Sequence, residues 1–187
     1  MGRSGEYRPF EAVVGHRIGF ALSRYRMTSR RSRAREVALQ LLFQHDRNPI
    51  PVPRAVAEAF ARDRLAGDTD AVAFALTLVD GVLANRVAID ERVSATAENW
   101  RLARMMPVDR NVLRLGTYEL GFAPDPTPVG VAMDEAIELA RRYGSAESPA
   151  FVNGILDRIA TVRRSEVGGR SEHPSQPPFE VSPESVS

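Results

Sequence analysis

A cluster of arginines is the sequence feature most suited to chemistry. Between positions 24 and 35 the chain has six arginines and no acidic residue: Arg24, Arg26, Arg30, Arg31, Arg33 and Arg35. A guanidinium can bind a phosphate through two hydrogen bonds or stack on an exposed base. A solvated basic surface with no ligand is the alternative. Because the run leads directly into an amphipathic helix, the pattern slightly favours RNA binding.

Aromatic side chains near this cluster could offer stacking faces for bases. Phe43 lies in the same predicted helix and Phe151 begins the last one. Phenylalanine at helical spacing is more often a core residue, and the same holds for Trp100 and Tyr118. The spacing alone therefore favours core positions for all four.

Nothing in the sequence predicts catalysis or metal binding. It contains no phosphate-binding glycine loop, no dinucleotide fingerprint, no His-Glu-x-x-His and no Gly-x-Ser-x-Gly. The absence of cysteine excludes disulfides, thiol nucleophiles and cysteine-bound zinc. The three histidines, His16, His45 and His173, are widely separated. We therefore predict a protein that is not an enzyme and has no metal site.

Charges on two later predicted helices have structural explanations. Asp109 falls in the first turn of a helix, where the helix dipole favours a carboxylate. Arg110, Arg114 and Glu119 follow on the same helix, and Glu138 and Arg142 form an i, i+4 pair. None of these residues indicates catalysis.

Length and composition fit one compact domain, or two tightly packed subdomains, of 187 residues with a formal charge of +1. Every basic residue is arginine, which favours an effect of genome composition. No apolar run approaches the roughly 20 residues that span a bilayer. The mildly apolar segment 10–22 is interrupted by His16 and Arg17 and lacks a small-residue cleavage site. We expect a soluble, cytoplasmic protein.

Helical periodicity dominates residues 28–163 and predicts an all-α fold of about seven helices. The first is capped near Thr28 or Ser29 and stops at Asn48-Pro49. The second begins after Pro53 and covers 54–62, and a long third helix starts near Asp68 or Asp70 and continues past residue 90, with Gly81 weakening it.

Proline and glycine mark the boundaries of the remaining predicted helices. A short helix covers 100–105, and another begins at Pro107 and ends before residues 124–126. Thr127-Pro128 opens a helix that ends at Gly144, and Ser148-Pro149 opens the last one.

Both ends of the chain differ from this helical region. Residues 1–27 lack periodicity and are predicted to be a flexible extension, and Met27 is a second candidate for the start of translation. Residues 164–187 are rich in proline, serine and glutamate and are predicted to be a disordered tail. The helical RNA-binding domain is expected at 28–163.

Three segments together resemble the NusB family. The first is RRSRAREVALQLLF at 30–43. The second combines Asn99-Trp100 and Arg104 with VDRNVLRL at 108–115 and YEL at 118–120. The third combines DEAIELA at 134–140 with FVNGILD at 151–157. They occur in the family's order across roughly 28–162, so the resemblance is specific.

The resemblance implies an all-α, NusB-like bundle of two packed helical subdomains. It also implies binding to the boxA element of nascent ribosomal RNA transcripts together with the small-subunit ribosomal protein NusE, within an RNA polymerase antitermination complex. Such a protein supplies binding and assembly, with no bond chemistry and no cofactor.

The resemblance also assigns site residues. It places Arg30, Arg31, Arg33, Arg35, Gln40, Phe43 and Phe151 on the RNA side, and Asp109 and Glu147 on the side of the partner protein. Ser32 interrupts the fuller arginine run of some members, which predicts one weaker phosphate contact.

Two rival interpretations and one open property remain. The same fold occurs as a module fused to ribosomal RNA cytosine methyltransferases, and this chain would then be an isolated fragment. A helical scaffold that only binds protein, with arginines that solvate its surface, is the rival from another class. Some family members are homodimers, so the sequence leaves the oligomeric state open.

Overall fold

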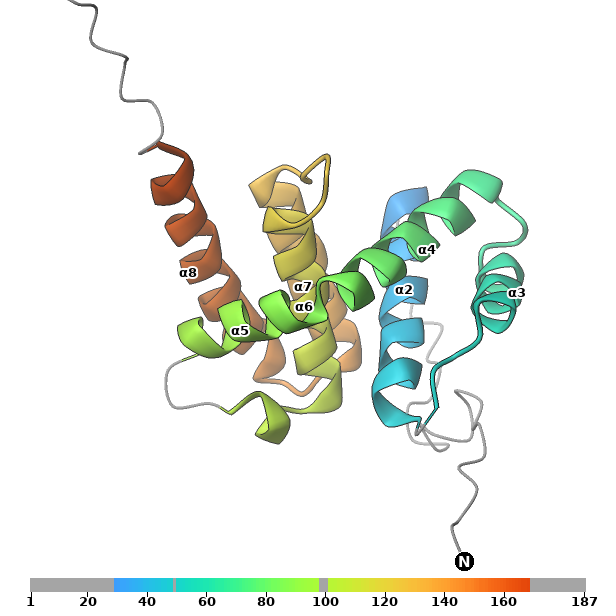
Figure 1. Cartoon of the computed structure of the whole chain (residues 1–187), viewed down its shortest axis with the longest axis horizontal. Coiled ribbons are helices and arrows are strands. Elements are labelled where there is room, and N and C mark those ends of the chain that lie inside the picture. Colours follow the sequence, from blue (N-terminus) through green and yellow to red (C-terminus); the bar gives the residue numbers. More distant parts are fainter. Residues whose placement is uncertain (1–28, 49, 98–100, 169–187) are drawn as a thin grey trace, which may run out of the picture.

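The computed structural model describes residues 29–48, 50–97 and 101–168, with side chains up to residue 163 (Figure 1). The described residues form seven α-helices, one short 3-10 helix and no strand, which confirms the predicted all-α fold. The elements are α2 (Arg30–Arg47), α3 (Arg54–Arg64), α4 (Thr69–Ala84), α5 (Arg86–Thr96), η1 (Leu102–Arg104), α6 (Pro107–Gly121), α7 (Val129–Tyr143) and α8 (Ser148–Gly168).

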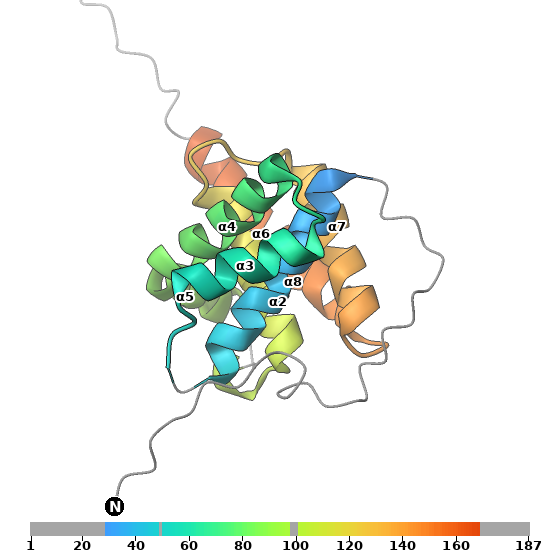
Figure 2. The same ribbon diagram turned by 90° about the vertical axis from the view of Figure 1, so that its right-hand side faces the viewer.

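The helices pack in two groups, as expected. Helices α2, α3 and α4 form one group, and α5, α6, α7 and α8 form the other (Figure 1). Figure 2 shows α3 lying across α2 and α4 on the outside of the first group. Contacts of α2 and α4 with α6 join the groups around one continuous core.

Helix α2 begins and ends where the sequence predicts. Ser29 is the N-cap, and its hydroxyl accepts a hydrogen bond from the amide of Ser32 at 3.0 Å. Asn48 is the C-cap, and Pro49 follows it. These local signals fix the helix that carries the arginine cluster.

The predicted long third helix is wrong, because the chain bends by 74° between α4 and α5. At the break, the Asn85 side-chain amide donates to the carbonyl of Gly81 at 2.8 Å, and its backbone leaves helical geometry. Asparagine competes in this way with the helical hydrogen bonds. The bend takes the chain from the first group of helices to the second.

Gly81 serves close packing between α4 and α6. A Cβ atom at this position would lie 2.1 Å from the Tyr118 ring, so only glycine allows the observed approach. Helix α6 runs through the centre of the molecule, and its side chains from Asn111 to Leu120 are all buried. It therefore contacts both groups of helices.

Other boundaries differ from the predictions in detail. The predicted helix at 100–105 is the 3-10 turn η1. Thr127 does not cap α7, because its hydroxyl donates to Glu119 at 2.7 Å. Helix α8 continues past residue 163, and the rest of the predicted tail, like the predicted 1–27 extension, lies outside the described residues.

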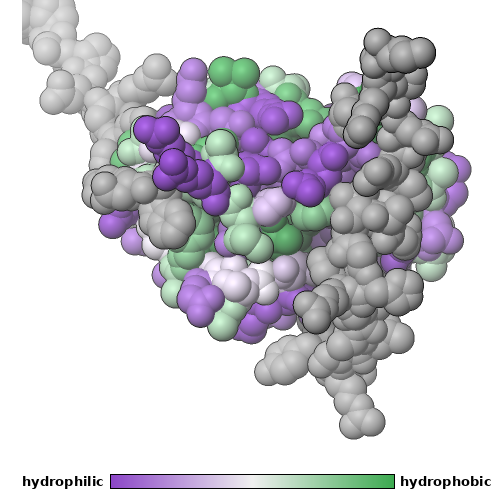
Figure 3. Space-filling view, turned by 90° about the horizontal axis from the view of Figure 1, so that it is seen from below, coloured by the Kyte–Doolittle hydropathy of each residue, from purple (hydrophilic) through white to green (hydrophobic). Residues whose placement is uncertain are grey.

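The described residues contain no single helix that is long and apolar enough to cross a membrane. Among them, only α4 and α5 taken together have the length and composition of a membrane span, and this pair is bent. On the face seen from below, hydrophilic side chains are interspersed with smaller apolar areas (Figure 3).

Candidate nucleic-acid interface

Three arginines of the cluster are exposed on the first turn of α2. Arg30 forms an ion pair with Asp68 at 3.3 Å while its side chain stays 78% exposed. Arg33 donates to the carbonyl of Arg64 at the end of α3, at 3.2 Å. Within the described residues neither Arg31 nor Arg33 pairs with a carboxylate. Their charge is therefore available to a phosphate.

Arg31 also contacts an aromatic ring. Its Cζ atom lies 5.0 Å from the centroid of the Phe74 ring on α4, within the range of a cation–π interaction. The Cζ atom of Arg35 lies 5.3 Å from the same centroid. Sequence reasoning missed Phe74, because no local pattern indicates that the single phenylalanine of α4 faces the arginines of α2.

Arg35 is a core residue with an exposed fraction of 2%. Its Nε and Nη2 atoms donate to the Glu119 carboxylate on α6 at 2.7 to 3.1 Å, and its Nη1 atom lies 3.8 Å from Glu135 on α7. The hydroxyl of Thr127 completes the shell of Glu119. This guanidinium is enclosed and already paired. The structure therefore contradicts the prediction that Arg35 contacts RNA.

Ser32 and Gln40 also face inward. Ser32 is buried and its hydroxyl donates to Glu135, so position 32 faces α7. A residue at this position does not face a ligand, so the prediction that serine weakens a phosphate contact here is wrong. Gln40 is 4% exposed, and its Oε1 atom has no hydrogen-bond partner among the described residues. Its burial likewise removes it from an RNA surface in this conformation.

The two predicted stacking residues do not lie on the turn that carries the exposed arginines. Phe43 is half-buried on α2, about 20 Å along the helix from Arg30 at 1.5 Å per residue. Phe151 is half-buried on α8 and packs against the core. The structure thus brings Arg30, Arg31 and Arg33 together on one turn, whereas Phe43 lies farther along α2 and Phe151 lies on α8.

The predicted partner-side residues lie close together at the starts of α6 and α8. Asp109 is 7% exposed, and its Oδ1 atom has no hydrogen-bond partner among the described residues. Burial raises the pKa of Asp109, and a hydrogen bond with the Ser148 hydroxyl opposes this. Glu147 precedes Ser148 and is exposed, and a hydrogen bond from Ser145 lowers its pKa.

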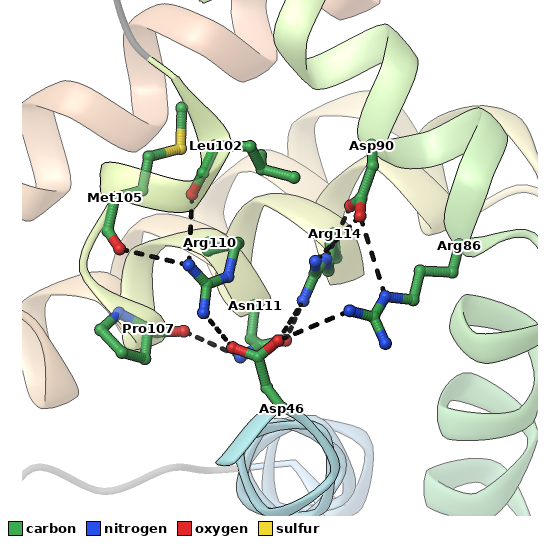
Figure 4. A network of polar contacts seen from close by, with 9 residues as sticks. All are labelled: Asp46, Arg86, Asp90, Leu102, Met105, Pro107, Arg110, Asn111 and Arg114. Atoms are coloured by element: carbon green, nitrogen blue, oxygen red, sulfur yellow. Dashed lines mark hydrogen bonds and ion pairs between the residues drawn. The ribbon is translucent and has the colours of Figure 1, made fainter. Parts of the chain in front are cut away.

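A second ion network joins the other end of α2 to α5 and α6 (Figure 4). Asp46 accepts hydrogen bonds from Arg110 and Arg114 and lies 3.8 Å from Arg86. Arg114 also pairs with Asp90 at 2.7 Å. Burial alone would raise the pKa of Asp46, but the hydrogen bonds and charges of Arg110 and Arg114 outweigh it and lower the pKa.

Sequence reasoning placed Arg110 and Arg114 on a helix but did not pair them with Asp46. Their i, i+4 spacing was a signal that both lie on one side of α6. The cavity beside the network has a volume of about 10 Å³, no larger than one water molecule needs. The network therefore holds helices together and leaves no room for a ligand.

Within residues 29–48, 50–97 and 101–168, no group of histidine and acidic side chains could hold a metal ion. The exposed, partly unpaired arginines at the start of α2 remain the feature best suited to a ligand, and that ligand carries negative charge.

Comparisons with known proteins place this arrangement in a family. The NusB family model matches residues 32–161. The transcription antitermination protein NusB of Sorangium cellulosum (strain So ce56) is 52% identical over 130 residues, which cover 70% of this chain and 91% of that protein.

Solved structures agree with this match. A T. maritima NusB structure has a TM-score of 0.60 and 42% identity, and the match covers 72% of this chain and 93% of that one. A structure of the antitermination factors NusB and NusE in complex with dsRNA has a TM-score of 0.63 and 26% identity, covering 73% and 99%. This chain therefore belongs to the NusB family of transcription antitermination proteins.

Proposed function

We propose that this protein binds the boxA element of nascent ribosomal RNA transcripts together with the ribosomal protein NusE, as part of an RNA polymerase antitermination complex. It acts by binding and assembly, without bond chemistry or a cofactor. The observation that carries the RNA part is the exposed group Arg30, Arg31 and Arg33 on the first turn of α2. Support for the partners comes from the similar NusB that was solved with NusE and dsRNA.

The RNA surface of this proposal comprises Arg30, Arg31 and Arg33. Phosphate contacts by these arginines release counterions, so affinity falls as salt rises. Phe43, farther along α2, and Phe151, on α8, stay predicted base contacts. Asp109 and Glu147 are proposed to face NusE, because they lie together at the starts of α6 and α8.

Titration of boxA RNA and a scrambled RNA with the full chain tests the proposal. We expect tighter binding to boxA, strengthened by NusE, because a second contact surface adds avidity. The double substitution Arg31→Ala/Arg33→Ala should weaken binding. It should also reduce the slope of log affinity against log salt concentration by about 1.4, because each of the two lost phosphate contacts contributes about 0.7 on a single strand. Equal affinity for both RNAs, unchanged by the substitutions, would contradict specific RNA binding.

A matched control removes two exposed arginines elsewhere. Arg54 lies at the opposite end of α3 from Arg64, and Arg141 lies on α7; both are exposed and each pairs with one carboxylate. The Arg54→Ala/Arg141→Ala variant loses the same net charge but should keep boxA affinity. Light scattering in the same titration distinguishes a monomer from a homodimer, and binding to NusE with no binding to RNA would favour a protein scaffold.

A further inference from the structure

The contact between Arg31 and Phe74 distinguishes Arg31 from the other exposed arginines. Arg30 and Arg33 use guanidinium nitrogens for Asp68 and for the Arg64 carbonyl. Arg31 is exposed, lies over the Phe74 ring, and has no carboxylate partner among the described residues. Its planar group is thus held by an aromatic ring.

The surroundings of Phe74 fix the position of this ring. Phe74 is half-buried against the core, and Arg35 lies over the same ring. Arg35 in turn is held by Glu119 through three hydrogen bonds. A buried, paired arginine and a packed ring therefore restrict where the Arg31 guanidinium can rest, which reduces the entropy that ligand binding costs.

Arg31 is exposed, so the side of its guanidinium that does not face the Phe74 ring is open to a ligand. Nucleobases stack on guanidinium planes, and such planes are weakly hydrated. We propose that Arg31, backed by Phe74, is a stacking site for one unpaired nucleobase. Arg31 would then contribute more than charge to RNA binding, and Phe74 is its positioning residue. This inference rests on the proposed RNA-binding function.

The test combines charge-conserving substitution with removal of single bases. Short single-stranded boxA RNAs, each with one base replaced by an abasic ribose, are titrated against the full chain and its Arg31→Lys variant. In the unsubstituted protein we expect one abasic position to raise Kd about tenfold. In the Arg31→Lys variant, the same abasic position should raise Kd by less than about twofold, because lysine keeps the charge but lacks the planar face.

Arg33→Lys is the matched control, because Arg33 is exposed two residues away and has no aromatic contact among the described residues. It should keep the full sensitivity to the abasic position. Phe74→Leu retains an apolar side chain and should lower affinity several-fold, with no additional loss when combined with Arg31→Lys. Phe74→Tyr keeps an aromatic ring and should bind RNA with the affinity of the unsubstituted protein. Circular dichroism verifies the folding of each variant.

The outcomes separate this inference from the proposed function. If the protein does not distinguish boxA from scrambled RNA, the proposed function fails and the stacking site with it. If boxA binds specifically but abasic sensitivity is the same in Arg31→Lys as in the unsubstituted protein, only the stacking site is overturned. If Arg31→Lys alters binding to NusE and leaves RNA binding unchanged, the surface is a protein contact, and the inference is likewise overturned.

Discussion

Arg31 and Arg35 lie one turn apart on α2 and over the same phenylalanine ring, yet their surroundings are opposite. Arg31 faces solvent and keeps its hydrogen-bonding nitrogens available, whereas Arg35 is enclosed by Glu119 and Glu135. Removing a side chain of the first kind costs a ligand contact. Removing one of the second kind leaves a buried carboxylate without its partner. A run of arginines therefore combines binding and structural residues.

The largest expected effect comes from Arg35→Ala. Because Glu119 would be left in the core without the guanidinium that pairs with it, we expect the free energy of unfolding to fall by about 3–5 kcal/mol. Urea denaturation followed by circular dichroism measures this. Arg141→Ala, which removes an exposed arginine on α7, provides the control and should change stability by less than about 0.5 kcal/mol. A loss below about 1 kcal/mol for Arg35→Ala would contradict its structural role.

The reverse result is expected for the exposed pair Arg31 and Arg33. The double alanine variant should weaken boxA binding by about 2 kcal/mol, roughly thirtyfold, because each charged hydrogen bond to a phosphate is lost. Its stability should stay within about 0.5 kcal/mol of the unsubstituted protein. Fluorescence anisotropy and urea denaturation of the same samples test both statements. Loss of stability with full RNA affinity would reverse the assignment of the two kinds of arginine.

Asp46 tests the comparison with a buried acid that has partners. The pKa of Asp46 is lower in the folded protein than its ordinary value of 3.8. The ionised Asp46 side chain therefore stabilises the fold fully above pH 3.8, and this stabilisation is lost as the pH falls through the folded pKa. We expect Asp46→Asn to cost about 1.5 kcal/mol at pH 7. The difference from the unsubstituted protein should shrink below pH 4. Urea denaturation from pH 2.5 to 7 measures it, and a constant difference across that range would contradict the role of the charge.

Asp109 gives the opposite and smallest effect, because it is buried with an unpartnered oxygen. A raised folded pKa means that the folded state binds the proton more tightly, so this group stabilises the fold as pH falls from its folded pKa toward 3.8. Asp109→Asn should therefore be stabilising by about 0.5 kcal/mol at pH 7, and the gain should vanish in acid. A loss of stability at pH 7 would show that the hydrogen bond with the Ser148 hydroxyl outweighs the cost of burying the carboxylate.

Helix boundaries were predictable where the signal is local. The cap at Ser29, the start at Pro107 and the start at Ser148 depend on residues next to each helix end. The bend at Asn85 was missed because the same asparagine is compatible with a continuous helix. Gly81 could be recognised as weakening α4, but its reason is Tyr118, which is distant in the sequence.

The candidate site was predictable only in part, for the same reason. Arginines at 30, 31, 33 and 35 look alike in sequence, and helical spacing does not reveal that Arg35 meets Glu119 across 84 positions. Gln40 and Ser32 were misplaced because α2 contacts α4, α6 and α7 and has little free surface. Partners on other helices decide which residue of the cluster faces solvent.

The two ion networks of α2 have opposite polarity along its length. Near its start α2 supplies Arg35 to Glu119, and near its end it supplies Asp46 to Arg110 and Arg114. Reversing the direction of α2 would place like charges together at both ends, and sliding it by one turn, about 5.4 Å, would separate both sets of partners at once. These networks therefore fix the position of α2 along its own axis. They thereby also fix how far its first turn, which carries the exposed arginines, extends beyond the neighbouring helices.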